Sequence, residues 1–268
     1  MQKEIIILPN KKQLEFYEKY NINTFLLPMK DFSIGFNTYF TKEEINKLSN
    51  KYCIYVLINK FMHKNIDKFK NIYDEFNKNI KFIVEDIGLS KIIDKDRIVI
   101  YENHIISNYK AINYLDSLGY NNIVINNDLT IHELKEIQEN TSSNLYYFYI
   151  SKNMLMYSRR NLVSNYNDYY NNKSDALEYV LREKVSNKLL EIKEEDDGSI
   201  VRYNKIFCAS KYLKDLGKLN LIIDLTNINE VSEMMILENI NNENLYNLID
   251  SDYYFLENDI KYKVGDIK

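Results

Sequence analysis

Two adjacent arginines stand out among the residues that could do chemistry. The chain has five arginines, and lysine supplies most of its positive charge, so the pair Arg159-Arg160 is unusual. A guanidinium grips a carboxylate or phosphate through two parallel hydrogen bonds, whereas an ammonium acts as a point charge. The pair therefore predicts an anion-binding site, with an exposed surface pair as the alternative. The preceding Tyr157 and Ser158 could offer hydroxyls to the same ligand or could simply anchor the loop.

A carboxylate that follows a short apolar run is the candidate catalytic residue. Asp86 lies just past the run Lys81–Val84 and two residues before Gly88. An aspartate at the end of a buried strand is well placed for acid–base catalysis or for orienting a ligand. The same side chain could instead cap a short helix that begins at Leu89 or Ser90. Both interpretations stay open at this level.

Other patterns of catalytic or metal-binding residues are missing from the sequence. His63, His104 and His132 have no ligand spacing such as H-E-x-x-H, so we predict no metal site. Cys53 and Cys208 each adjoin apolar residues, which favours packed over reactive thiols. Neither a G-x-S-x-G turn nor a P-loop occurs.

Composition limits the classes of protein that remain. The net charge of −4 argues against a generally basic surface for nucleic acid, although a local basic pocket stays open. The N-terminal stretch lacks the long apolar segment of a signal peptide, and no apolar run is long enough to cross a membrane. We therefore expect a cytoplasmic protein that does not associate with membranes.

Short apolar runs alternate with stretches of helical period, which is the pattern of βα units. The strands are predicted at Glu4–Leu8, Thr24–Leu27, Tyr52–Ile58, Lys81–Val84, Arg97–Tyr101, Asn122–Ile125, Leu145–Ile150 and Leu221–Leu225. Eight strands joined by right-handed crossovers predict an α/β fold that closes as a (β/α)8 TIM-like barrel. The rival is a doubly wound open sheet, which usually has a glycine-rich first turn for phosphate. The turn Leu8–Lys12 contains no glycine, so we favour the barrel.

Helix signals follow most of these strands. Thr41 and Glu44 form a T-x-x-E capping box, and Gly119 marks a helix end. Helices are predicted over Lys11–Tyr20, Thr41–Asn50, Ile66–Asn77, Asn108–Leu118, Thr130–Asn140 and Asn229–Asn239, with a short one after Gly88.

One long segment interrupts the alternation between the seventh and eighth strands. We expect residues 1–268 to form a single barrel domain in which residues 151–220 are an insertion at the C-terminal face. Alternating residues predict a small β-rich unit, with a turn at Asp196–Gly198. Its strands are predicted at Ala176–Lys184, Lys188–Lys193 and Ser199–Tyr203, and a helix at Cys208–Leu216.

The segment Tyr147–Asn165 resembles the signature of the peptidase U32 family, roughly E-x-F-x-x-G-A-L-C-x-x-Y-S-G-R-C-x-x-S. The matching positions are Phe148, Tyr157, Ser158, Arg160, Leu162 and Ser164. Tyr146 stands where the family has its glutamate, and Ser151 and Arg159 replace its glycines. Met154 and Asn161 replace its two cysteines.

Weaker similarities continue in the family's order, each just past a predicted strand. They are Asp31-Phe32-Ser33, the segment Asn59–His63, Asp86 with Gly88, Asn108, Asp128-Leu129 and Glu133-Leu134. Through this resemblance, Asn59 and Asn108 join Tyr157, Ser158, Arg159 and Arg160 as predicted ligand-binding residues.

The resemblance implies two kinds of activity. Some members are classed as collagenase-type peptidases, and others take part in hydroxylation of tRNA bases, ribosomal RNA bases or ubiquinone precursors. Several of the latter hold a [4Fe–4S] cluster on four cysteines. Because Met154 and Asn161 supply no thiolate, we expect no cofactor of that kind in this chain.

Three functions follow from the resemblance. The first is a barrel without the cluster that binds an anionic ligand or RNA at its C-terminal face, as a member or accessory of RNA or metabolite hydroxylation. Its partners would be a second U32-like chain and tRNA or rRNA. The second is a peptidase, and the third is a non-catalytic binding barrel.

Overall fold

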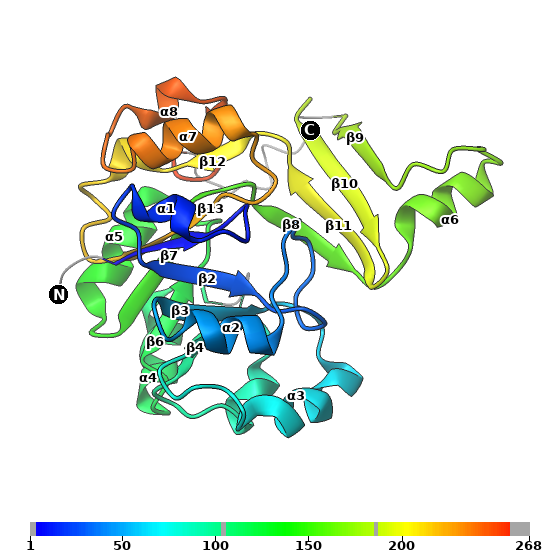
Figure 1. The fold of residues 1–268 in the computed structure, drawn as a ribbon. Helices are drawn as coiled ribbons and strands as arrows, with labels where there is room; N and C mark the ends of the chain where they lie inside the picture. The colour runs from blue at the N-terminus through cyan, green and yellow to red at the C-terminus, as the bar shows by residue number, and fades with distance from the viewer. Residues whose placement is uncertain (1–3, 103–105, 185–186, 258–268) are drawn as a thin grey trace.

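A closed barrel of eight parallel strands forms the centre of the molecule (Figure 1). The computed structural model describes residues 4–102, 106–184 and 187–257. The barrel closes because β13 pairs in parallel with both β1 and β7. Its strands are β1 (Ile5–Leu8), β2 (Thr24–Pro28), β3 (Cys53–Ile58), β4 (Lys81–Val84), β5 (Ile98–Ile100), β6 (Asn122–Ile125), β7 (Asn144–Ser151) and β13 (Asn220–Asp224). The prediction of a (β/α)8 barrel is thereby confirmed, with each predicted strand found to within two residues at its ends.

Helices cover the outer face of the barrel. They are α1 (Glu15–Glu18), α2 (Lys42–Leu48), α3 (Ile66–Tyr73), α4 (Tyr109–Ser117), α5 (Ile131–Asn140), α7 (Glu230–Glu238) and α8 (Leu245–Leu248), with the 3-10 helices η1 (His63–Asn65) and η2 (Ile87–Lys91). The predicted capping box of Thr41 and Glu44 is confirmed at the start of α2. Gly119 follows α4 with a φ of +89°, as its predicted role as a helix stop requires.

The first helix is much shorter than predicted. Its expected start at Lys11 is replaced by a turn in which the Tyr17 hydroxyl accepts hydrogen bonds from the backbone N–H groups of Asn10 (3.0 Å) and Lys11 (3.3 Å). These hydrogen bonds hold Asn10 and Lys11 in the turn that precedes the helix. Tyr17 in turn donates to Glu233 of α7 at 2.9 Å, which ties the start of the chain to its last βα unit.

Side chains alternate between the barrel interior and the layer beneath the helices. Leu26, Tyr55, Ile83, Val99 and Ile222 belong to the interior cluster. Their neighbours along the same strands pack instead in the larger cluster between sheet and helices. Both faces of the parallel sheet are therefore buried, which explains why the strands read as continuous apolar runs.

A polar network fills the N-terminal end of the barrel. The Tyr55 hydroxyl donates to Glu4 at 2.9 Å and lies 3.3 Å from the Tyr146 hydroxyl. The Asn144 amide donates to Tyr146 at 2.8 Å, and Asn220 donates to Asn144 at 2.7 Å. Tyr55 and Tyr146 are buried, so this network pairs polar groups that would otherwise be costly inside the barrel.

The segment between β7 and β13 forms a second, antiparallel sheet beside the barrel mouth (Figure 1). Its strand order is β8-β11-β10-β9, with β8 (Met154–Ser158), β9 (Glu178–Arg182), β10 (Leu189–Glu195) and β11 (Gly198–Tyr203). The three strands and the turn predicted here are confirmed, whereas β8 and helix α6 (Leu162–Tyr169) were not predicted.

The helix predicted at Cys208–Leu216 is wrong. Ile206–Cys208 form strand β12, which pairs antiparallel with the end of β7 and parallel with β14 (Ser251–Asp252). Only the 3-10 helix η3 (Ser210–Tyr212) follows. The strand β7 extends past the barrel and pairs with β12 as far as Cys208, so the chain cannot be helical before Ala209.

The β10–β11 turn depends on a glycine. Gly198 has a φ of +132°, and a Cβ there would lie 2.1 Å from the carbonyl oxygen of Ser158. We predict that Gly198→Ala destabilises the protein by about 1–3 kcal/mol through this strain and clash. Thermal unfolding followed by circular dichroism measures the effect.

Gly217→Ala is the matched control, because its nearest contact would be 3.3 Å and its φ is not in the left-handed region. Equal melting temperatures for the two variants would contradict this account of the turn.

Candidate functional site

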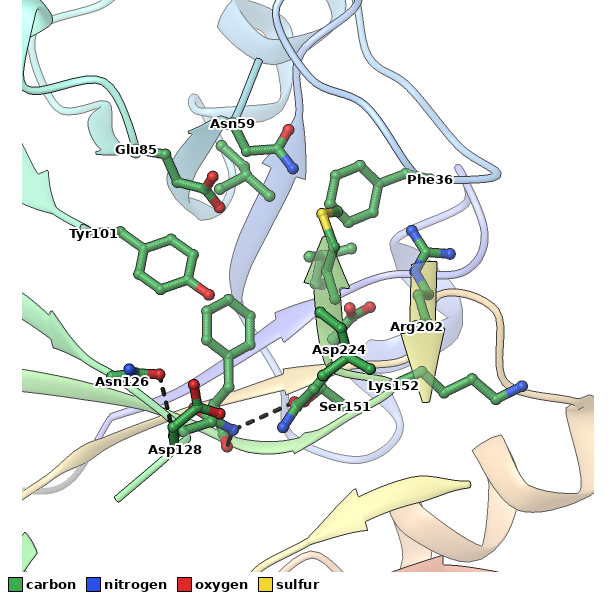
Figure 2. A pocket seen from close by; sticks show the side chains of 17 residues that line it. Phe36, Asn59, Glu85, Tyr101, Asn126, Asp128, Ser151, Lys152, Arg202 and Asp224 are labelled. Carbon is green, nitrogen blue, oxygen red and sulfur yellow. Dashed lines mark hydrogen bonds between the residues drawn. The ribbon is translucent and has the colours of Figure 1, made fainter. Parts of the chain in front are cut away.

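A cavity of about 60 Å³ opens at the C-terminal mouth of the barrel (Figure 2). Several of the side chains that line it continue the interior alternation at the ends of their strands. Ile83, Val99 and Ile222 face the interior. Two residues later along each strand, Glu85, Tyr101 and Asp224 point in the same direction and line the cavity. The cavity is lined by Leu8, Phe36, Leu57, Asn59, Glu85, Tyr101, Asn126, Asn127, Asp128, Phe148, Ser151, Lys152, Asn153, Met154, Leu155, Arg202 and Asp224.

Glu85 follows β4 and faces the cavity. Burial raises the pKa of its carboxyl to about 8, and the negative charge of Glu102 adds to the effect. A carboxyl with this pKa is mostly protonated at neutral pH, so it can donate a hydrogen bond or a proton.

Asp224, at the end of β13, is tuned differently. Burial raises the pKa of its carboxyl to about 6. The Thr226 hydroxyl and backbone N–H both donate to the Asp224 carboxylate, the latter at 2.9 Å, and together with the charge of Arg202 they limit that rise. Asp224 is therefore mostly ionised at neutral pH, which leaves one carboxyl protonated and another charged at the same cavity.

Tyr101 presents a hydroxyl between these carboxyl groups. Burial raises its pKa well above the ordinary value of 10.0, and the negative charges of Glu85, Asp128 and Asp224 raise it further. Its ring packs against Phe148 with the centroids 5.3 Å apart. The hydroxyl therefore stays protonated and can act as a hydrogen-bond donor.

The cation at the cavity comes from the second sheet rather than from the barrel. Arg202 of β11 is only 6% exposed, and its guanidinium donates to the carbonyl oxygen of Gly35. The guanidinium of Arg202 interacts electrostatically with the carboxylates of Asp224 and Glu195. Figure 2 shows Arg202 across the cavity from Glu85 and Tyr101. Lys152 lies at the rim, where it pairs with Glu191 at 2.7 Å.

Gly35 makes this contact sterically feasible. It has a φ of +95°, and a Cβ at this position would lie 2.4 Å from the Arg202 guanidinium. The Asn227 amide also donates to the Gly35 carbonyl at 3.3 Å. The loop after β2 is thus held from two sides, which fixes one wall of the cavity.

Of the predicted site residues, Asn59 alone lines the mouth cavity. Its amide is engaged with the backbone of Ile34, accepting from the N–H at 2.9 Å and donating to the carbonyl at 3.1 Å. The Asp86 carboxylate caps η2 by accepting from the Gly88 N–H at 2.8 Å. Asn108 caps α4 by accepting from the Ala111 N–H at 3.0 Å.

The predicted arginine pair lies at the far end of β8, away from the mouth cavity. Arg159 and Arg160 are exposed, and Arg159 borders a separate cavity of about 140 Å³ next to Lys60. Tyr157 stacks on Phe61 with the centroids 4.7 Å apart and donates to the Asp197 carbonyl at 3.2 Å. Ser158 accepts from the Arg160 N–H at 3.3 Å. Ligand binding by these four residues stays a prediction.

Sequence reasoning missed Glu85, Tyr101, Asp224 and Arg202. The first three carry only a partial signal, because each follows an apolar strand but the sequence does not show which face of that strand is the barrel interior. Arg202 carries no such signal, because the sequence around it does not indicate that a strand of the second sheet reaches the barrel mouth.

No described group of three or more His, Cys, Asp and Glu side chains is arranged to hold a metal ion. His104 lies outside the described residues. Among the helices that the structure describes, none is both long and apolar enough to span a bilayer.

The family's iron–sulfur cluster does not fit the residues present. Met154 begins β8 at the cavity, whereas Asn161 precedes α6 at the other end of that strand. Cys53 is exposed at the start of β3 and Cys208 is buried at the end of β12, so neither lines the mouth cavity. Four thiolates cannot be gathered from these positions.

Comparison with known proteins places the barrel in a family. A sequence model of Peptidase family U32 matches residues 10–230. The chain therefore belongs to Peptidase family U32, as the resemblance in the sequence predicted. No curated protein matches the sequence.

Solved structures give only distant likenesses. The U32 peptidase Mk0906 has 10% identity over 83% of this chain and 92% of its own, with a TM-score of 0.46. The spore cortex-lytic enzyme SleL of Bacillus megaterium QM B1551 has 10% identity over 84% of this chain and 70% of its own, with a TM-score of 0.36. TM-scores below 0.5 carry no inference, so neither activity is transferred.

The raised pKa of Glu85 predicts a pH-dependent stability. Since the folded-state pKa of about 8 exceeds the ordinary 4.5, the native protein holds a proton that the unfolded chain releases between these values. Stability should therefore fall as pH rises through this window, by on the order of 2 kcal/mol once cavity water is allowed to solvate the ionised form. Urea unfolding at a series of pH values measures it.

Glu85→Gln should remove most of this dependence between about pH 6 and pH 8, because the amide cannot ionise. The raised pKa values of Asp224 and Glu102 should keep part of the dependence at lower pH. Glu136→Gln, on the exposed face of α5, is the control and should leave the wild-type dependence intact. If the stability of Glu85→Gln still fell steeply between about pH 6 and pH 8, the pH dependence would have to come from other groups.

Proposed function

We propose that the mouth cavity binds a small ligand with an anionic group and transfers protons to or from it. The observation that carries this proposal is the convergence of two carboxyls, Glu85 and Asp224, on one cavity that Arg202 also lines. Burial there raises the pKa of Glu85 to about 8 and that of Asp224 to about 6. At neutral pH the first can serve as a general acid and the second as a general base.

The lining suggests how such a ligand is oriented. Its anionic group would face the Arg202 guanidinium, while hydroxyl or amino donors would face Asp128 and Asp224. A cavity of about 60 Å³ favours one end of a metabolite-sized molecule over a polymer.

A direct binding experiment tests the site. Isothermal titration with serine, malate and inorganic phosphate presents a zwitterion, a hydroxylated dianion and a plain anion. We predict that Arg202→Lys weakens the probe that binds by about tenfold or more, because an ammonium cannot reproduce the guanidinium geometry. A melting curve checks that the variant is folded.

Arg160→Lys is the matched control at the exposed end of β8. If Arg160→Lys weakened binding of the probe and Arg202→Lys did not, the anion site would lie at the arginine pair Arg159-Arg160. Binding of none of the three probes would count against the proposal.

We further propose that this protein takes part in RNA or metabolite hydroxylation, as a member or accessory of the system that itself holds no [4Fe–4S] cluster. The narrow cavity favours the metabolite form. A second U32-like chain would then supply the redox centre. Nucleoside mass spectra of tRNA and rRNA from cells with and without the gene test the RNA form, and an unchanged profile rules that form out.

Peptide hydrolysis is the second candidate, and the carboxyl pair favours it as well. One protonated and one ionised carboxyl can together polarise an amide and activate water. Gelatin and fluorogenic peptides are the substrates to test. We predict that Glu85→Gln and Asp224→Asn each lower any cleavage at least about a hundredfold.

Asp86→Asn separates this assignment from the prediction made on sequence alone. Asp86 faces η2 and not the cavity, so its variant should keep most of the cleavage. Loss in Asp86→Asn with retention in Glu85→Gln would restore Asp86 as the catalytic residue. Ligand binding by the wild type without any turnover would favour the non-catalytic binding barrel.

A further inference from the structure

The outer edge of the second sheet is an exposed strand. β9 is paired on one side with β10, and it stands last in the order β8-β11-β10-β9. Val180 is 59% exposed and Leu181 is 42% exposed, an unusual level for apolar residues in a strand. Unpaired strand edges with apolar side chains are templates for a further strand.

The hydrogen-bonding direction of each β9 residue can be derived from its ends. The Glu183 N–H donates to the Lys188 carbonyl at 2.9 Å, and the Glu194 N–H donates to the Leu177 carbonyl at 2.8 Å. Because hydrogen-bonded and non-hydrogen-bonded pairs alternate in an antiparallel ladder, odd-numbered β9 residues bond to β10. The backbone groups of Glu178, Val180 and Arg182 therefore point outward, away from the sheet.

We propose that this edge pairs with β9 of a second copy of the chain. An antiparallel pairing about a two-fold axis at Val180 sets Val180 opposite itself. The same register sets Glu178 of one copy opposite Arg182 of the other, at both ends of the strand. The outward backbone groups of all three residues then meet as hydrogen-bonded pairs.

The side chains complement one another in this register. Within the described part of the chain, Glu178 has no ion-pair partner, and Arg182 makes only a 3.5 Å contact with the Asn187 carbonyl. Pairing places opposite charges across the axis and brings Tyr179 opposite Leu181 on the other face. The two four-stranded sheets become one continuous sheet.

Charge exchange across the axis gives a sharp test. In Glu178→Arg the facing residues are both arginine, and in Arg182→Glu they are both glutamate. We predict that the wild type is a dimer. The dimer dissociation constant of each variant alone should be at least about tenfold higher than that of the wild type. Mixed together, the two variants carry opposite charges at both ends and should form a heterodimer.

Sedimentation velocity across a range of concentrations measures these states. Lys110→Glu, an exposed charge change on α4, is the control and should dimerise like wild type. A monomeric wild type at every concentration overturns the proposal. So does a dimer that neither charge variant weakens, or a mixture that stays monomeric.

Disulfide trapping reads the register itself. In a Cys53→Ser background, Val180→Cys should form a cross-linked dimer on oxidation, because the two Val180 positions face each other at a spacing that a disulfide can bridge. Glu178→Cys should not, since its facing residue is Arg182. Equal trapping at both positions would contradict this register.

Discussion

Closure of the barrel is the constraint on which the remaining features depend. β13 joins β1 to β7, and only then do the carboxyl ends of all eight strands converge on one opening. Glu85 and Asp224 come from strands far apart in the sequence, yet closure makes them line one cavity. The burial that raises both pKa values depends on the same closure, because the closed barrel surrounds both carboxyls with neighbouring strands and loops.

Much of the fold could be read from the sequence, because parallel strands buried on both faces appear as unbroken apolar runs. Lys81–Val84 and Asn122–Ile125 are found at the predicted residues. The errors fall where distant partners override local pattern. The Tyr17 hydroxyl holds Asn10 and Lys11 in a turn ahead of the shorter first helix, and β7 pairs with Phe207 and Cys208 as a strand.

The site was harder to predict for a different physical reason. Successive residues of a strand point to opposite faces, so only one of Glu85 and Asp86 can point into the barrel mouth. When both faces of the strand are apolar, the local sequence does not show which of the two it is. Asp86 falls on the side of the helices and caps one of them. Arg202 was beyond reach because its position depends on how the second sheet docks against Gly35.

The two ends of the barrel differ in one respect that affects kinetics. At the N-terminal end of the described interior, the side chains of Tyr55 and Tyr146 are buried and their hydroxyls lie 3.3 Å apart, so packed side chains fill this end. Anything that enters at the mouth must leave by the same opening. Under the proposed function, reactant and product would occupy the same cavity and pass through this one opening, so accumulated product would compete with reactant for the site.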